Sequence, residues 1–255
     1  MRGRCRPPLP EGLKIVGRFD LVMFDLDGTL VETAPEIADA TNDTLRAFGW
    51  PEASQAQVEA WIGHGTRELL IQAVASATAA TAAQIRDADW LPAVAATFDR
   101  HYAARCGTRS RPYPHARELL QRLRTQGVRL AVVTNKERRY TDSVLNAHAL
   151  TPMLDRVISG DTLPRKKPDP SGVEACLSEF GVTRDRALFV GDSSIDVATA
   201  RNAGVAIWLL PHGYNMGQPV ADAQPDAIVA DFTALAAALD SPGLGKTGPA
   251  TEASA

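Results

Sequence analysis

Short, fully apolar runs are the clearest pattern along the chain, and polar residues follow each run at once. Continuous apolar character of this kind is typical of strands that are buried on both faces of a parallel sheet, whereas half-exposed strands alternate. Gly, Asp and Thr after a run favour a turn that ends the strand. The pattern predicts buried strands at 21–24, 130–133 and 187–190, further strands at 157–158 and 205–210, and an edge strand at 227–229.

Helical periodicity separates these strands in the second half of the chain. Apolar residues recur every three or four positions around 119–123, 144–145 and 173–180, and Gly127 and Gly181 end two of these segments as helix-terminating glycines do. Alternating helices and strands predict an α/β fold, with a Rossmann-like parallel sheet wrapped by helices. Ligands of such sheets bind outside the carboxyl ends of the strands.

The segment that follows the first strand, up to residue 110, has a different character. It is rich in alanine and helical in period, with Ser54 as a candidate N-cap and no convincing strand. We therefore expect a small helical cap domain inserted into the sheet domain. The expected boundaries are a catalytic core at 19–32 and 111–240, a cap at 33–110, and disordered tails at 1–18 and 241–255.

Composition narrows the class of partner. The 255 residues carry a formal net charge of -3, so no strong field favours nucleic acid or an anionic membrane surface. No apolar run reaches membrane-spanning length. Cys5, Cys106 and Cys176 are too few and too irregularly spaced for a disulfide framework or a zinc site. We expect a cytoplasmic protein that binds a small molecule, and the oligomeric state stays open.

Residues with chemical function gather where the predicted strands end. Because the carboxyl ends of parallel strands meet at one edge of a sheet, we expect these residues to form one site. Crowded carboxylates raise each other's pKa values, and a hard divalent cation such as Mg²⁺ relieves the repulsion. The residues are Asp25, Asp27, Thr134, Asn135, Asp192 and Asp196, with the basic pair Lys166-Lys167 on a nearby loop.

Two aspartates spaced two positions apart suit a two-step transfer of a phosphoryl group, because residues i and i+2 of an extended stretch share a face. Asp25 would attack phosphorus and form an aspartyl-phosphate. Asp27 would protonate the departing oxygen and then take a proton from water. Lys167 would supply positive charge to the phosphate oxygens, and the Thr134 hydroxyl would supply a directed hydrogen bond.

Four segments in this order resemble the motifs of the haloacid dehalogenase superfamily, and the helical insert is similar to that family's small cap. The segments are Phe24 to Leu30, Val132 to Lys136, Lys166-Lys167-Pro168 and Val190 to Asp196. The resemblance covers residues 20–239. Within the superfamily the chain most resembles the bacterial phosphoglycolate phosphatases, through Thr134 to Lys136, Lys167 to Pro170 and His212 to Asn215.

The resemblance implies a Mg²⁺-dependent hydrolase that converts 2-phosphoglycolate to glycolate and phosphate. It implies that Asp25 is the nucleophile and that Asp27 is the acid–base, with a further contact from the Asp27 backbone carbonyl to the metal. Asp25 and Asp192 would be the other metal ligands, with Asp196 in support. The implied phosphate-binding residues are Thr134, Asn135 and Lys167.

A glycine-rich turn, Gly63-His64-Gly65-Thr66-Arg67, joins two of the expected cap helices. Such a turn could close over the site, with Arg67 holding a substrate carboxylate and His64 beside it. The alternative is a helix-connecting loop with a surface arginine.

Other functions of the same superfamily remain to be weighed. A phosphonatase uses a cap lysine to form an imine, and residues 32–110 contain no lysine. A dehalogenase typically lacks an aspartate at the position of Asp27. A phosphomutase shares both aspartates and a similar cap, so it stays open, as does a phosphatase for another small ester. A catalytically silent binding module would usually lack one of the motif carboxylates, and all of them are present here.

Overall fold

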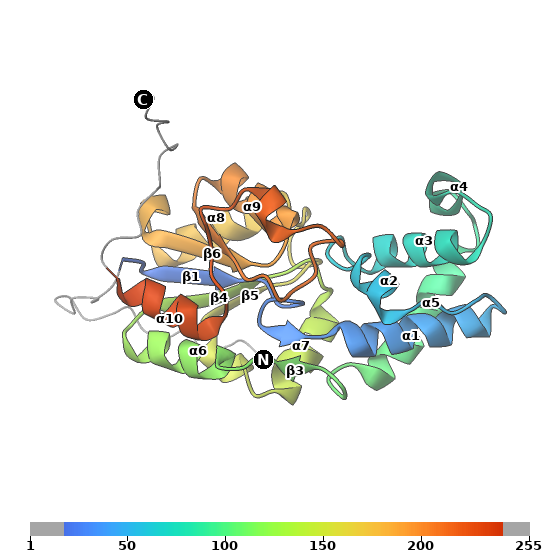
Figure 1. The fold of residues 1–255 in the computed structure, drawn as a ribbon, viewed down its shortest axis with the longest axis horizontal. Coiled ribbons are helices and arrows are strands. Elements are labelled where there is room, and N and C mark those ends of the chain that lie inside the picture. The colour runs from blue at the N-terminus through green and yellow to red at the C-terminus, as the bar shows by residue number, and fades with distance from the viewer. Residues whose placement is uncertain (1–17, 242–255) are drawn as a thin grey trace, which may run out of the picture.

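A computed structural model describes residues 18–241 of the chain. Its two parts are a sheet with helices on both faces and a group of helices to one side (Figure 1). Apart from Arg18 and Ser241, the two predicted tails lie outside the described residues. Among the described residues, no helix combines the length and the apolar character needed to cross a bilayer.

The main sheet has six strands in the order β5-β4-β1-β6-β7-β8, and all neighbouring pairs are parallel. The central strand β1 pairs with β4 on one side and with β6 on the other, so that Phe24 lies opposite both Val132 and Val190. This confirms the predicted α/β fold. The strands are β1 Leu21–Phe24, β4 Arg129–Val133, β5 Arg156–Ile158, β6 Ala187–Gly191, β7 Ala206–Leu209 and β8 Ala227–Ile228.

Alternate side chains of the fully buried strand β1 enter two different apolar cores. Val22 and Phe24 pack with helices on one face, and Leu21 and Met23 pack with helices on the other. The first face carries α6 Ala116–Thr125, α7 Arg138–Ala147 and α10 Phe232–Asp240, and the second carries α8 Ser171–Phe180 and α9 Ser194–Ala203. Short 3₁₀ turns complete the connections at Thr151–Met153, Arg184–Arg186 and Val220–Ala223.

Five helices follow one another between residues 34 and 105, and we call them the helical segment. Their apolar residues form a third core, separate from the two cores of the sheet. Ser54 caps the second helix in a capping box with Gln57, as its position suggested. The fourth helix has only five residues, which are too few to show a periodic pattern in the sequence. The helices are α1 Ala34–Ala47, α2 Gln55–Glu59, α3 Thr66–Ala77, α4 Ala82–Arg86 and α5 Leu91–Arg105.

A two-stranded antiparallel ribbon lies where the chain enters and leaves the helical segment. It consists of β2 Val31–Glu32 and β3 Arg111–Pro112. The fully buried carboxylate of Glu36 accepts hydrogen bonds from the backbone N–H groups of Gly107 and Ser110, each at 2.9 Å. Glu36 therefore ties the start of α1 to the returning chain, a role that its polar residue type did not indicate.

Truncation of an apolar side chain should lower the free energy of unfolding strongly in the sheet core and weakly at the sheet edge. Leu188 is fully buried between the strands and helices of the first face, whereas Ile228 on the edge strand is 46% exposed. We expect Leu188→Ala to lower the free energy of unfolding by about 2–5 kcal/mol. The matched control Ile228→Ala should lower it by less than about 1 kcal/mol. Urea titration of both variants measures the difference, and equal losses would contradict this assignment of the core.

Candidate active site

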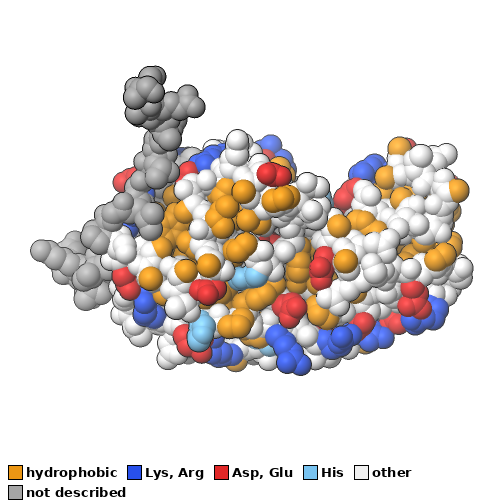
Figure 2. All heavy atoms as spheres, in the orientation of Figure 1, with side chains coloured by type: hydrophobic (Ala, Val, Ile, Leu, Met, Phe, Trp, Pro, Cys, Tyr) orange, Lys and Arg blue, Asp and Glu red, His pale blue; other side chains and the backbone are white. Residues whose placement is uncertain are grey.

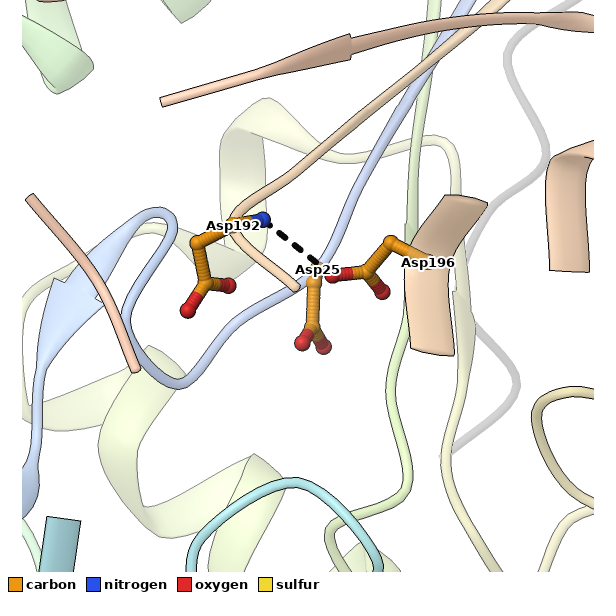
Figure 3. A group of neighbouring side chains, drawn as sticks. All are labelled: Asp25, Asp192 and Asp196. Atoms are coloured by element: carbon orange, nitrogen blue, oxygen red, sulfur yellow. Dashed lines mark hydrogen bonds between the residues drawn. The ribbon is translucent and has the colours of Figure 1, made fainter. Parts of the chain in front are cut away.

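Polar side chains stand at the carboxyl ends of the three central strands. Asp25 directly follows β1, Thr134 directly follows β4, and Asp192 directly follows β6. One carboxylate oxygen from each of Asp25, Asp192 and Asp196 lies within 4.8 Å of the others, and all three residues are buried (Figure 3). The structure therefore brings together acidic residues that are up to 171 positions apart in the sequence.

Lys167 lies among these carboxylates. Its ammonium is 2.9 Å from Asp25 Oδ1 and donates a hydrogen bond of 2.7 Å to Asp196 Oδ1. Burial alone would lower the pKa of Lys167, but the charges of Asp196 and Asp25 outweigh it and hold the pKa above its usual value. Lys167 thus brings a permanent positive charge to the residue expected to attack phosphorus.

Asp25 is buried, and one of its carboxylate oxygens lacks a well-formed hydrogen bond within the described structure. Its Oδ1 atom is in ion-pair contact with Lys167, but among the described residues it accepts no hydrogen bond of good geometry. Burial raises the pKa of Asp25 to about 6; the Lys167 charge opposes this rise, and the Asp196 carboxylate adds to it. A buried carboxylate in this condition gains from any further positive charge that enters the site.

Asp192 is held in a fixed orientation. Its Oδ1 atom accepts a hydrogen bond of 2.6 Å from the Thr29 hydroxyl, and its Oδ2 atom accepts one of 2.5 Å from the Tyr214 backbone N–H. Burial, with Asp196 and Asp25 nearby, raises the pKa of Asp192 well above its usual value. The carboxylates of Asp192 and Asp25 point in the same direction in Figure 3.

Asp196 differs from the other two carboxylates because both of its oxygens accept hydrogen bonds from nearby residues of the chain. Its Oδ2 atom accepts hydrogen bonds from the backbone N–H groups of Asp192 and Ser193 and from the Ser193 hydroxyl. Its Oδ1 atom accepts from Lys167. Asp196 therefore fixes the loop that carries Asp192 and the position of the Lys167 ammonium.

Asp27 has separate partners. Its Oδ1 atom accepts a hydrogen bond of 2.7 Å from the Thr33 hydroxyl. The ammonium of Lys136 donates to both carboxylate oxygens of Asp27, at 3.0 and 3.2 Å. Burial would lower the pKa of Lys136, but Asp27 and other nearby acidic groups raise it overall. Sequence reasoning noted Lys136 only as part of a motif, although its place two residues after Thr134 was a usable signal.

The donor set fits a divalent cation. Asp25, Asp27, Asp192 and Asp196 contribute four carboxylates to the site, and Lys136 and Lys167 contribute two ammonium groups. Two negative charges remain when all six groups are ionised, which is the charge that one Mg²⁺ neutralises. Oxygen-only ligands are also the type that Mg²⁺ prefers.

Asp25 and Asp27 share a narrow chamber of about 40 Å³ between the sheet edge and the helical segment. Apolar side chains of the helical segment form its other wall, among them Ile37, Leu69 and Phe98. Thr134, Asn135 and Lys136 also line the chamber. The chamber therefore brings the carboxylates of the sheet edge and apolar side chains of the helical segment to one place.

The comparisons with known proteins agree with this geometry. Residues 22–209 match the family model described as haloacid dehalogenase-like hydrolase. The chain belongs to this family. Two relatives named phosphoglycolate phosphatase are 36% identical over 219 residues, from Aliivibrio fischeri, and 37% identical over 218 residues, from Mannheimia succiniciproducens. Each alignment covers 86% of this chain, and it covers 96% and 97% of the relatives respectively.

A crystal structure from Haemophilus somnus, described as a predicted phosphoglycolate phosphatase, superposes with a TM-score of 0.79 and is 35% identical. The superposition covers 86% of this chain and 96% of that one. Family membership and these relatives identify the chain as an enzyme, a phosphatase of the haloacid dehalogenase-like hydrolases.

The loop residue Asn135 of this hydrolase holds neighbouring backbone. Its side-chain amide donates to the carbonyls of Gly63 and Lys167, at 2.9 and 3.0 Å, while its Oδ1 atom accepts no hydrogen bond. A contact between Asn135 and phosphate stays a prediction. The observed bonds join the glycine-rich turn of the helical segment to the loop that carries Lys167.

Arg67 and His64 lie outside the chamber. They line a second cavity of about 650 Å³ between the helical segment and the sheet part of the hydrolase, where Figure 2 shows the molecule hollowed. Arg67 donates to the carbonyl of Arg86 at 2.8 Å, and Lys166 donates to the carbonyl of His64 at 2.5 Å. The expected contact of Arg67 with a substrate carboxylate stays a prediction, and it would need the turn to move.

Gly213 packs so closely against Asp192 that there is no room for a side chain at position 213. A Cβ atom added at Gly213 would lie 2.2 Å from Asp192 Oδ2 and 2.4 Å from the carbonyl oxygen of Gly28. We expect Gly213→Ala to displace Asp192 and to lower phosphatase activity on p-nitrophenyl phosphate by about 100-fold.

Gly217 is the matched control on the same loop. A Cβ atom there meets nothing within 4 Å, although its φ of 74° is left-handed. Gly217→Ala should add about 1–2 kcal/mol of backbone strain and leave activity within a few-fold of the unchanged enzyme. Equal activity losses in the two variants would contradict a specific effect on Asp192.

Proposed function

We propose that this phosphatase hydrolyses 2-phosphoglycolate to glycolate and phosphate, with Mg²⁺ and through a phosphorylated Asp25. The observation that carries the proposal is the pairing of Asp25 and Asp27 in one narrow chamber with different partners. The names of the relatives support the choice of substrate. Small phosphate ester is the substrate class, and neither nucleic acid nor a membrane is expected as a partner.

The residues that would hold Mg²⁺ are Asp25 and Asp192 through their carboxylates and Asp27 through its backbone carbonyl. The Oδ1 atom of Asp25, which has an ion-pair contact with Lys167 but no hydrogen bond of good geometry from the described residues, supports this assignment, as does the raised pKa of Asp192. When bound, the cation would neutralise charge on the phosphate oxygens and on the carboxylates around them. Asp196 supports the site by fixing the loop of Asp192.

The chain's own groups can carry both chemical steps. In the first step a carboxylate oxygen of Asp25 attacks phosphorus, the bond from phosphorus to the ester oxygen breaks, and Asp27 gives a proton to that oxygen. In the second step water attacks phosphorus, Asp27 accepts the proton of that water, and the carboxylate of Asp25 leaves. Lys167 and the Thr134 hydroxyl would bind the phosphate oxygens during both steps.

The helical segment would act as a cap. Its apolar residues close the chamber opposite the carboxylates, which would keep bulk water away from the acyl phosphate. The core and cap boundaries expected from the sequence, near residues 33 and 110, belong to this proposal.

A phosphomutase of the same family remains the alternative, because both aspartates would serve it equally well. A phosphatase for a different small ester would keep the mechanism and change the substrate. A silent binding module is the weakest of these, because every carboxylate of the site is present and buried or partly buried.

Phosphate release from 2-phosphoglycolate, beside a panel of small phosphate esters, tests the proposal. We expect turnover with Mg²⁺, loss of turnover with a chelator, and a kcat/KM for 2-phosphoglycolate at least about 10-fold above that of the other esters, which corresponds to about 1.4 kcal/mol of transition-state binding. Metal-dependent turnover of another ester would discard the substrate and keep the mechanism. Formation of an isomeric sugar phosphate would indicate the mutase.

The phosphorylated intermediate gives a second test. With ³²P-labelled substrate and an acid quench, the unchanged enzyme should retain label, because acyl phosphates survive brief acid treatment. Asp25→Asn should retain none and lose activity by at least about 10⁴-fold. Asp240→Asn is the control, because Asp240 is exposed and its side chain is paired with Arg122 on the surface of the described structure. Label retained by Asp25→Asn would assign the nucleophile to another residue.

A further inference from the structure

The proposed reaction leaves one buried charge without a role. Lys136 is 6% exposed and lines the chamber, yet no step requires it to contact the phosphate. An isolated buried ammonium is costly, so its partners indicate what it does. Those partners are Asp27, the expected acid–base, and Tyr102 of the helical segment.

Lys136 holds both oxygens of the Asp27 carboxylate. The distances of 3.0 and 3.2 Å fix the plane of the carboxylate, whereas the Thr33 hydroxyl contacts only Oδ1. Without Lys136, one hydrogen bond to one oxygen would remain among the contacts described, and the carboxylate could rotate about it. A proton donor needs a defined direction toward the departing oxygen.

Tyr102 in turn fixes Lys136. Its hydroxyl accepts a hydrogen bond of 2.6 Å from the Lys136 ammonium, and its ring lies 4.8 Å from the same atom. The ring is packed against Phe98 and Tyr140, so Tyr102 has little freedom. Tyr102 belongs to α5 and Lys136 follows β4, so this contact links the helical segment to the sheet part.

We infer that Lys136 is a positioning residue for Asp27 and that Tyr102 holds Lys136 in place, so that both parts of the molecule aim the acid–base carboxylate. This inference rests on the proposed function. It assigns Lys136 to proton transfer at the ester oxygen, whereas Lys167 contacts Asp25 and Asp196 and would bind the phosphate in the proposed reaction.

The leaving group separates a positioning role from a structural one. An alkyl ester such as 2-phosphoglycolate releases a poor leaving group that must be protonated, whereas p-nitrophenolate departs without a proton. If the Asp27 carboxylate loses its orientation, phosphorylation of the enzyme by the alkyl ester should therefore slow far more than phosphorylation by p-nitrophenyl phosphate. The second step uses Asp27 as a base for water, so it should slow with both esters.

The test is rapid-quench kinetics of Lys136→Met with both esters, beside Asp27→Asn as the reference for lost acid–base function. We expect phosphorylation by 2-phosphoglycolate to fall by about 100-fold and phosphorylation by p-nitrophenyl phosphate to fall by less than about 5-fold, with KM nearly unchanged. Slowed hydrolysis of the intermediate should appear as a burst of p-nitrophenol equal to the enzyme concentration.

Lys166→Met is the matched control. Lys166 lies on the neighbouring loop and contacts the His64 carbonyl instead of Asp27, so its effect should be the same with both esters and should produce no burst. Tyr102→Phe removes the acceptor of the Lys136 ammonium but keeps the ring, and we expect the same leaving-group dependence at about one tenth of the size.

An equal loss with both esters in Lys136→Met would overturn the inference, as would unchanged kinetics. If Lys136→Met does not fold, the same kinetics are measured with Tyr102→Phe and Lys136→Arg. If neither variant slows phosphorylation by 2-phosphoglycolate more than phosphorylation by p-nitrophenyl phosphate, the inference is also overturned. Two other outcomes would contradict the proposed function and not this inference. One is that Asp27→Asn slows phosphorylation by both esters equally, and the other is that the unchanged enzyme releases phosphate from no ester.

Discussion

The structure depends on the crowding of buried carboxylates at one edge of a parallel sheet. Asp25, Asp192 and Asp196 lie too close together, and too far from water, to be ionised without compensation. The fold provides part of that compensation through Lys167 and through hydrogen bonds from loop backbone. The remaining negative charge is what makes the site suitable for a divalent cation.

Each carboxylate has a different supply of partners, and this difference separates their roles. Asp196 is saturated by the chain, Asp192 is oriented by two donors, and Asp25 keeps an oxygen without a hydrogen bond. Chemically identical side chains within a few ångströms thus become a support for the loop, a candidate metal ligand and a candidate nucleophile. The positions of nearby backbone N–H groups and lysines make the distinction, because residue type alone does not.

The sequence predicted the sheet and the location of the site because both follow from local patterns. Apolar runs such as Leu21–Phe24 mark buried strands, and polar residues directly after them must lie at the carboxyl edge. The contact between Lys136 and Asp27 was missed, although both residues follow neighbouring strands and the place of Lys136 just after Thr134 pointed to the same edge. The contact between Lys136 and Tyr102 could not be found in this way, because it depends on how the helical segment packs against the sheet. The surroundings of Arg67 could not be predicted either, because the glycine-rich turn predicted a helix junction there but not which cavity Arg67 lines. The structure places Arg67 in the first turn of α3.

The short ribbon of β2 and β3, together with Glu36, makes the helical segment look like a module that could be exchanged between relatives. The chain enters and leaves it at neighbouring points, so a foreign module could be joined there with little disturbance of the sheet. Tyr102 limits that freedom, because it accepts a hydrogen bond from the lysine that holds Asp27. A transplanted module would bring a new wall to the chamber but would also remove the tyrosine that contacts Lys136. If Asp27 is the acid–base, substrate range and catalysis are inherited together in this architecture, and a chimera would have to carry a tyrosine or an equivalent acceptor at the same place.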